Sequence, residues 1–150
     1  MDTVTQEQRS LNMSHIRSKD TKVEVKVRKY LFSQGFRYRK NDKRFPGKPD
    51  IVLPKYKTVI FIHGCFWHQH EDCPIAHIPK SNVSFWQRKF SMNRERDERN
   101  KKELISMGLQ VIIVWECTVN KMKKDDSIKE NILADIINAI KNGEDLYYEF

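Results

Sequence analysis

The segment from His63 to Cys73 concentrates residue types that bind metal ions. It contains two of the three cysteines of the chain and three of its five histidines. Cys117 follows an apolar run at residues 110–115, and the end of a neighbouring strand can return it to this segment. Zinc takes such soft thiolate and imidazole donors in closed, four-coordinate structural sites. The spacing therefore predicts a structural zinc centre with four ligands: Cys65, His70, Cys73 and Cys117.

Two other uses of these residues compete with a zinc centre. Disulfide bonds are disfavoured, because the number of cysteines is odd and histidines cluster beside them. The cysteines could also be small buried residues and the histidines surface residues. Against that, the interval 65–73 holds four ligand-type residues in a loop with little else to hold it. Because a closed site cannot activate water, any catalytic metal must lie elsewhere.

Asp50 is the candidate ligand for a catalytic metal. It opens a predicted strand directly after Pro49, as the acid does in the first half of the PD-(D/E)xK nuclease pattern. Such acids bind Mg²⁺, which acts on the scissile phosphate and the attacking water. Pro-Asp is also an ordinary turn sequence, and the next predicted strand, residues 58–63, lacks the E-x-K of the second half.

A mixed face is predicted on a long helix at residues 82–107. Its members recur at intervals of three and four residues, so they share one side of the helix. An aromatic ring, a cation, an amide and an acid would suit a nucleic-acid surface, although an isolated helix of this kind could simply be polar and exposed. The four residues are Trp86, Lys89, Asn93 and Asp97.

The elements that must position these residues are those of a mixed α/β sheet flanked by helices. A helix is predicted from Asp20 or Thr21 to about Gln34, with Gly35 at the position after its C-cap. Strands are expected at residues 36–40, 50–53 and 58–62, the last two as a hairpin. Residues 63–80 are irregular, residues 110–115 form a strand buried on both faces, and residues 127–141 form a final helix.

The charge of the chain favours a polyanionic partner. Its net charge is +8, yet the segment from Asp125 onward carries seven acids and two lysines. The first 124 residues therefore hold 26 basic and 13 acidic residues. A basic body suits DNA or RNA, because neutralised phosphates release counterions, but a solvated lysine-rich surface has the same composition. The N-terminus lacks a signal-peptide pattern and no apolar run could span a bilayer, so a cytoplasmic location is expected.

Several separate blocks, in order, resemble the very-short-patch repair (Vsr) endonuclease family, a variant of the PD-(D/E)xK nucleases. The resemblance covers about 70% of the chain, from about Asn12 to Cys117. The blocks are IRSKDT at 16–21, FPGKPD at 45–50, IFIHGCFWH at 60–68, NRERD at 93–97 and VWEC at 114–117. It implies a PD-(D/E)xK-like endonuclease fold. The length of the chain predicts one domain over residues 1–150, and the polar first segment, 1–18, is expected to be a DNA-contacting arm. Residues 125–150 would form an acidic helical tail outside the resemblance.

The resemblance also implies catalytic roles. Asp50 and the backbone carbonyl of Ile62 would bind Mg²⁺, and His68 would transfer a proton at the scissile phosphate, work that suits an imidazole near neutral pH. His63 and Asp97 would position the attacking water. Glu24 would be an acid on the first helix that faces the site, although it could also be a solvated helix residue.

Residues that read DNA are implied in the same way. Phe66, Trp67 and Trp86 match aromatics that wedge between base pairs beside a T:G mismatch, and Met13 matches a residue inserted from the opposite groove. Lys89 and Asn93 lie on the helix face described above. A wedge costs unstacking energy and kinks the duplex, and a mismatched step is easier to open.

Three functions are compatible with the sequence. The first is a Mg²⁺-dependent nickase that cuts 5′ to the thymine of a T:G mismatch formed by deamination of 5-methylcytosine. It would be linked to a DNA cytosine-5 methyltransferase and possible mismatch-repair and polymerase partners. The second is a restriction-type endonuclease on the same scaffold that cuts paired DNA. The third is a zinc-stapled DNA-binding module without catalysis, which would not need Asp50, His63 and His68.

Overall fold

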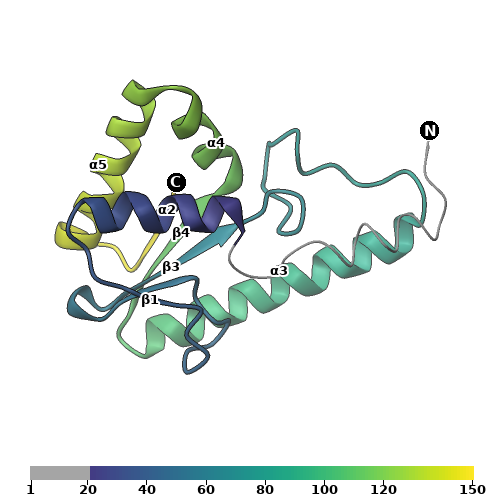
Figure 1. Cartoon of the computed structure of the whole chain (residues 1–150). Helices are drawn as coiled ribbons and strands as arrows, with labels where there is room; N and C mark the ends of the chain where they lie inside the picture. The colour runs from purple at the N-terminus through teal and green to yellow at the C-terminus, as the bar shows by residue number, and fades with distance from the viewer. Residues whose placement is uncertain (1–20) are drawn as a thin grey trace.

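The computed structural model describes residues 21–150, and their centre is a five-stranded mixed sheet (Figure 1). The strand order is β1-β2-β3-β4-β5. β1 (Arg39–Lys40), β2 (Ile51–Leu53) and β3 (Thr58–His63) pair antiparallel, with Val52 opposite Val59. β4 (Gln110–Trp115) runs parallel to β3, and β5 (Tyr147–Glu149) runs parallel to β4. The expected mixed α/β architecture is confirmed.

Helices cover both faces of the sheet and bury its strands. α2 (Lys22–Ser33), α4 (Glu116–Lys124) and α5 (Asp126–Asn142) pack on one face, where Leu31, Met122 and Ile136 contact the isoleucines of β2, β3 and β4. α3 (Val83–Ser106) packs on the other through Leu104. Every residue of β4 is buried, as the apolar run predicted. A short 3₁₀ turn, η1 (Pro54–Tyr56), closes the β2–β3 hairpin.

Local sequence signals set the ends of the predicted helices. The Thr21 hydroxyl accepts a hydrogen bond from the Glu24 N–H at 3.2 Å, which caps α2 as expected. Gly35 and Gly108 lie just beyond α2 and α3 with φ of +90° and +85°. Glycine adopts this left-handed conformation without the steric penalty of a Cβ atom, so each helix stops there.

The structure differs from the expected elements at three places. The strand at 36–40 is reduced to Arg39–Lys40, an edge strand with one neighbour. Residues 116–124 form a helix, α4, that was not predicted from the sequence. The acidic segment 125–150 is not wholly helical, because Tyr147–Glu149 joins the sheet as β5. None of the described helices has the length and apolar character needed to span a bilayer.

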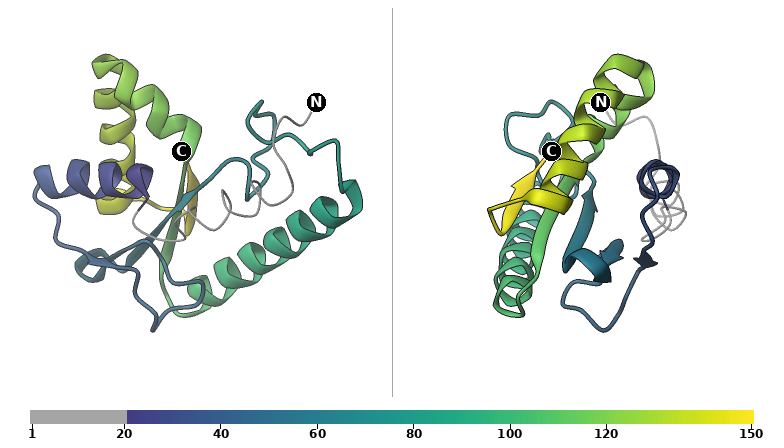
Figure 2. Two further views of the ribbon diagram at one scale, coloured as in Figure 1. Left: turned by 45° about the vertical axis from the view of Figure 1, so that its right-hand side comes forward. Right: turned by 90° about the vertical axis from the view of Figure 1, so that its left-hand side faces the viewer.

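Two long segments meet beside the sheet. The N-terminal half of α3 extends beyond the strands, and the irregular segment 64–82 leaves β3 and returns to the start of that helix (Figures 1 and 2). The C-terminal ends of β3 and β4 therefore open toward this segment, and the candidate site residues lie there.

Candidate active site and metal centre

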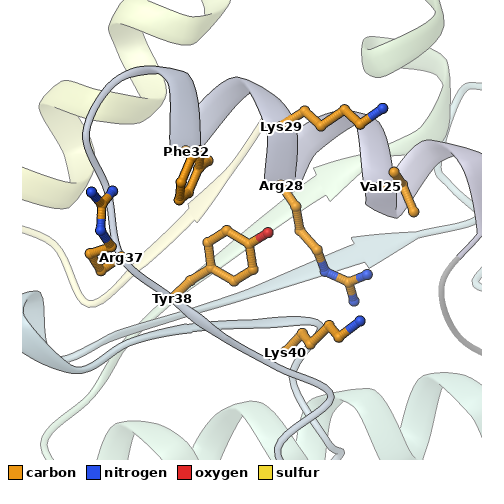
Figure 3. Close-up of a pocket in the computed structure, with 7 residues that line it drawn as sticks. All are labelled: Val25, Arg28, Lys29, Phe32, Arg37, Tyr38 and Lys40. Carbon is orange, nitrogen blue, oxygen red and sulfur yellow. The ribbon is translucent and has the colours of Figure 1, made fainter.

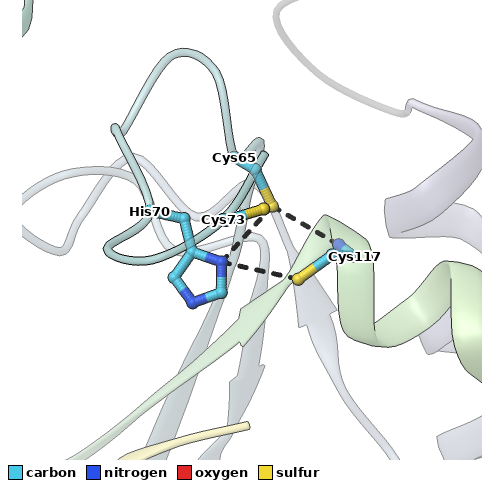
Figure 4. A group of neighbouring side chains, drawn as sticks. All are labelled: Cys65, His70, Cys73 and Cys117. Carbon is cyan, nitrogen blue, oxygen red and sulfur yellow. Dashed lines mark hydrogen bonds between the residues drawn. The ribbon is translucent and has the colours of Figure 1, made fainter. Parts of the chain in front are cut away.

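Four side chains converge at the C-terminal ends of β3 and β4 in the arrangement of a metal centre (Figure 4). The His70 Nδ1 atom lies 3.6 Å from Cys65 Sγ and 3.4 Å from Cys117 Sγ. Ligand bonds of zinc at tetrahedral angles would place sulfur and nitrogen about 3.6 Å apart. The ligand atoms of the whole group lie within 4.8 Å of one another. The structure thus brings together the predicted set: Cys65, His70, Cys73 and Cys117.

Backbone groups around the cysteines prepare them to carry negative charge. The Cys117 N–H, in the first turn of α4, points at Cys65 Sγ at 3.4 Å. Burial acts to raise the pKa of Cys73, but the N–H groups of Ile75 and Ala76 and its cysteine neighbours lower it overall. Burial raises the pKa of Cys65 to about 12. A cation among the sulfurs is the natural way to hold this buried thiol as a thiolate.

The ring of His70 is also held by a residue at the end of β4. It stacks on Trp115 with ring centroids 4.1 Å apart and planes 9° apart. Glu116, the next residue, accepts a hydrogen bond from the Cys65 N–H at 3.3 Å. The strand end and the loop are therefore joined by contacts around the four ligands as well as through them.

Asp50 lies at the start of β2, across the hairpin from the end of β3. Its Oδ2 accepts a hydrogen bond of 2.7 Å from the Ile62 N–H. The two predicted oxygen donors, the Asp50 carboxylate and the Ile62 carbonyl, therefore belong to groups in contact across the β2–β3 pair. Mg²⁺ prefers one or two such oxygen ligands and keeps water for the rest of its octahedron.

Three further predicted residues meet beside this strand end and form a second group with metal-ligand potential: His63, His68 and Asp97. Asp97 Oδ2 lies 2.6 Å from His68 Nδ1. Because an ionised carboxylate can only accept, Nδ1 is the donor in this contact and Nε2 is left for another partner. The rings of His63 and His68 stack with centroids 3.7 Å apart and planes 2° apart.

His63 is kept neutral by its surroundings. Burial, and then the neighbouring His68, lower its pKa from 6.5 to about 3, although Asp97 acts in the opposite direction. Its edge contacts Trp115 at 5.2 Å between centroids. A neutral imidazole stacked on His68 can orient that ring and accept or donate hydrogen bonds without adding positive charge.

Glu24 lies on α2 and reaches the site through an arginine that the sequence reading did not select. Glu24 is 5% exposed, and its Oε2 lies 3.5 Å from the Arg28 guanidinium. The same Arg28 nitrogen donates to Asn41 Oδ1 and to the Asp50 carbonyl, both at 3.2 Å. Arg28 therefore ties α2 to the chain at Asp50. Its i,i+4 spacing from Glu24 was the available sequence signal.

The predicted aromatic wedge residues form one half-buried cluster between the loop and α3. Phe66 has its ring centroid 5.1 Å from Trp67 and 5.4 Å from Trp86, and the two tryptophans are 6.0 Å apart. Buried Phe90 supports the cluster from below, 5.2 Å from Phe66. The sequence reading did not select Phe90, although it follows Trp86 by one helical turn.

Asn93 fixes the loop to α3. It is 5% exposed, its amide donates to the Trp67 carbonyl at 3.0 Å, and its oxygen accepts from Arg96 at 2.6 Å. These bonds use the amide that had been expected to contact DNA. Lys89 is exposed on the same helix. Met13, expected to enter the opposite groove, and the arm at 1–18 lie outside the described residues.

Comparison with known proteins finds relatives that cover most of the chain. The family described as DNA mismatch endonuclease Vsr matches residues 1–74, a span that contains Asp50, His63 and His68. The type II nicking enzyme V.NmeAIP of Neisseria meningitidis is 55% identical over 142 residues, or 95% of this chain and 98% of the relative. The DNA mismatch endonuclease Vsr of Escherichia coli is 40% identical over 126 residues, or 83% and 80%. V.XorIIP of Xanthomonas oryzae is 41% identical over 88% of this chain and 96% of its own.

The chain belongs to the Vsr family. It is a DNA endonuclease, as the resemblance of its sequence blocks to this family predicted, and the hypothesis of a non-catalytic binding module is set aside. In this Vsr endonuclease the loop 64–82 supplies three of the four potential metal ligands, Cys65, His70 and Cys73. The same loop supplies Phe66 and Trp67 of the aromatic cluster, followed directly by His68.

Proposed function

We propose that this endonuclease nicks one DNA strand 5′ to the thymine of a T:G mismatch. The observation that carries the proposal is that two of the proposed wedge residues and the proposed proton-transfer residue lie on one short segment. Phe66, Trp67 and His68 are consecutive, and the segment is clamped to α3 twice, by Asn93 at the Trp67 carbonyl and by Asp97 at His68. A base step opened by the rings would therefore place its own phosphate within reach of the imidazole.

Asp50 and the backbone carbonyl of Ile62 would hold Mg²⁺. Their fit rests on the donor chemistry, since both offer hard oxygen atoms, and on the Asp50–Ile62 contact across the hairpin. Bound there, Mg²⁺ would neutralise charge on the scissile phosphate and make an attacking water easier to deprotonate. Arg28, bonded to the Asp50 carbonyl, keeps this end of β2 against α2.

His68 would move the proton in the reaction. With Nδ1 bonded to Asp97, Nε2 faces the reacting group with its lone pair or, when protonated, donates. Asp97 therefore acts through His68 by fixing its tautomer, and His63 supports the ring by stacking. In this arrangement Glu24 acts through Arg28 as a positioning residue.

The aromatic cluster would supply the mismatch preference. Phe66, Trp67 and Trp86 are half-buried, so each residue is held by its neighbours and still partly exposed. Inserting rings between bases costs unstacking energy, and a T:G step has already lost Watson–Crick geometry. Such a mismatch arises when 5-methylcytosine deaminates, so we also propose a functional link to a DNA cytosine-5 methyltransferase and to repair and polymerase partners.

We further propose that the four-ligand group binds zinc and that the fold is a variant of the PD-(D/E)xK nucleases. The sulfur–nitrogen distances and the soft donor set support zinc. All four positions are taken by protein ligands, so the ion would be structural. A mixed sheet flanked by helices, with Asp50 at the start of a strand, supports the fold assignment.

The test is a nicking assay with end-labelled duplexes that differ only at one base pair. We expect Mg²⁺-dependent cleavage of one strand 5′ to the thymine of T:G, and little cleavage of the fully paired duplex. Mapping the labelled product gives the strand and the bond. Equal cleavage of both duplexes would overturn the mismatch preference.

A second candidate is an endonuclease that nicks paired DNA at its own sequence. The observation in its favour is that several relatives carry the name type II nicking enzyme. The same active-site geometry would serve this reaction. Cleavage of the paired duplex in only certain sequence contexts would support this candidate and leave the roles of Asp50 and His68 in place.

A further inference from the structure

A basic cavity of about 680 Å³ lies between α2 and the chain leading into β1 (Figure 3). Its walls combine positive charge with aromatic rings, and no acidic residue is among those that line it. Two cations come from α2 and two from the opposite wall. The six principal residues are Arg28, Lys29, Phe32, Arg37, Tyr38 and Lys40.

The side chains of this cavity are held in place from behind. The Arg37 guanidinium lies over the Phe32 ring at 4.8 Å from its centroid, which limits its freedom. Arg28 is 4% exposed and fixed by its bonds to Asn41 and Asp50. In Figure 3 the Tyr38 hydroxyl and the Arg28 guanidinium point into the space between the helix and the strand, and Lys40 lies below them.

One end of the cavity borders the proposed metal site. Lys40 pairs with Ile51, the residue after Asp50, and the Asn41 N–H donates to the Asp50 carbonyl at 3.3 Å. Arg28 donates to the same carbonyl. A DNA strand whose scissile phosphate lies at Asp50 would therefore have this cavity beside it.

We propose that the α2–β1 cavity binds backbone phosphates of the DNA strand that flanks the cleaved bond. The inference rests on the proposed position of the scissile phosphate at Asp50. Arg28 is paired with Glu24, but no acidic residue lines the cavity beside Arg37 and Lys40. Exposed cations of this kind suit phosphates, and successive phosphates along a DNA strand match positive groups spread along an open wall. Arg37 and Lys40 lie on the outer wall and make direct contacts, while Arg28 supports the wall from within.

The decisive variant removes the two outer charges, Arg37→Gln with Lys40→Gln. Both residues are exposed, so folding is expected to be retained, which a melting curve checks. The dissociation constant for a T:G duplex is measured over a range of salt concentrations. We expect a slope of log affinity against log salt shallower by about 2, since each lost phosphate contact contributes about 0.9.

Two controls separate a local contact from general charge. Lys123→Gln with Lys124→Gln removes the same charge from exposed positions on α4, and should leave the slope nearly unchanged. Arg37→Lys with Lys40→Arg keeps the charge and should bind nearly as the wild type does. If the α4 pair changes the slope as much, or if the charge-keeping pair binds as weakly as the glutamine pair, the proposal is wrong.

Shortened duplexes then locate the contact. One series is shortened on the 5′ side of the nick and the other on the 3′ side. The loss of affinity caused by Arg37→Gln with Lys40→Gln should disappear in the series that lacks the contacted phosphates, and should persist in the other series. A loss of affinity that persists in both series, or an unchanged affinity for every duplex, overturns the proposal. Because the binding measurement also works with paired DNA and without cleavage, it can fail or succeed independently of the T:G nicking assay.

Discussion

At the scale of single residues, Asp50 combines a structural contact with the proposed metal role. Asp50→Asn keeps an oxygen that can accept from the Ile62 N–H, so the fold and DNA affinity should be retained. The lost negative charge should reduce nicking by at least about 10³-fold, since a metal contributes several kcal/mol to such a transition state. Single-turnover rates with Mg²⁺, beside melting and binding curves, check this. A variant that nicks at near wild-type rate would remove Asp50 from the site.

His68 and Asp97 should behave as one unit. His68→Ala is expected to reduce the nicking rate by about 10²- to 10⁴-fold, the usual range for a lost general acid–base group, and to flatten the pH–rate profile. Asp97→Asn should also reduce the rate, because an amide can donate to Nδ1 and favour the wrong tautomer. The double variant should be no slower than His68→Ala alone. Multiplied effects, or an unaltered pH profile in His68→Ala, would contradict the pairing.

His63 gives a prediction about pH. Burial lowers its pKa to about 3, below the value of about 6.5 expected for the unfolded chain. Between these two values the unfolded chain binds the extra proton, so this residue contributes a loss of stability as pH falls from 6.5 toward 3. NMR of the imidazole should show neutral His63 at pH 5.5 in the metal-loaded protein. His63→Asn should show a weaker fall in the free energy of unfolding between pH 6.5 and 5.5. A measured midpoint above pH 6 would refute the neutral assignment.

At the scale of elements, the four-ligand group joins the loop 64–82 to the start of α4. Cys117→Ser should remove one ligand and free both elements, lowering the melting temperature by about 10 °C or more, because metal-binding energy is folding energy at such a site. Elemental analysis should find one zinc per wild-type chain. The matched control is Lys123→Gln, on the same helix and away from the sulfurs, which should leave both measurements unchanged. Absence of zinc from purified protein, or a fully stable Cys117→Ser, would refute the centre.

Elements set by local signals were predictable, and elements set by distant partners were not. Thr21 and Gly35 marked the ends of α2 through capping and backbone conformation, and the apolar run at 110–115 marked β4. β5 needed β4 beside it, since three residues at an edge carry little pattern of their own. α4 was missed because its mixed polar sequence gave a weaker signal than the strand before it.

The site residues also divide into those that the sequence predicted and those that depend on how distant elements pack. The grouping of Cys65, His70, Cys73 and Cys117 followed from residue type and spacing, because few chemistries use that set. The bond from Arg28 to the Asp50 carbonyl depends on how α2 crosses the hairpin, which the sequence does not state. Asn93 was expected on the DNA surface, yet it is buried against the Trp67 carbonyl. An amide on a helix face can contact DNA or bond to a neighbouring loop. The sequence does not distinguish these two uses, and the structure shows the bond to the loop.

At the scale of the whole molecule, the four-ligand group, the aromatic cluster and the His68–Asp97 pair form one continuous unit on α3 and the sheet. The chain runs from Cys65 through Phe66 and Trp67 to His68 without interruption. Metal binding should therefore position the wedge and the imidazole together. Mismatch recognition and cleavage would then depend on the same loop, and weakening its clamp to α3 should affect both.

The tryptophans give the test of discrimination between substrates. Trp67→Ala or Trp86→Ala should cost about 1–3 kcal/mol of base stacking per ring. That loss should fall mainly on the T:G duplex, where the rings can enter the stack at the lowest cost, so the ratio of affinities for T:G and paired DNA should fall by roughly 5- to 150-fold.

Lys89→Gln is the matched control for the tryptophan variants, because it changes an exposed residue on the same helix by one charge. Lost phosphate contact should weaken both duplexes equally and make the salt slope shallower by about 0.9. The ratio of affinities for T:G and paired DNA should therefore stay constant. If the tryptophan variants also weaken both duplexes equally, the rings serve as packing between the loop and α3. The wedge would then be refuted, and nicking of paired DNA would become the better description of this enzyme.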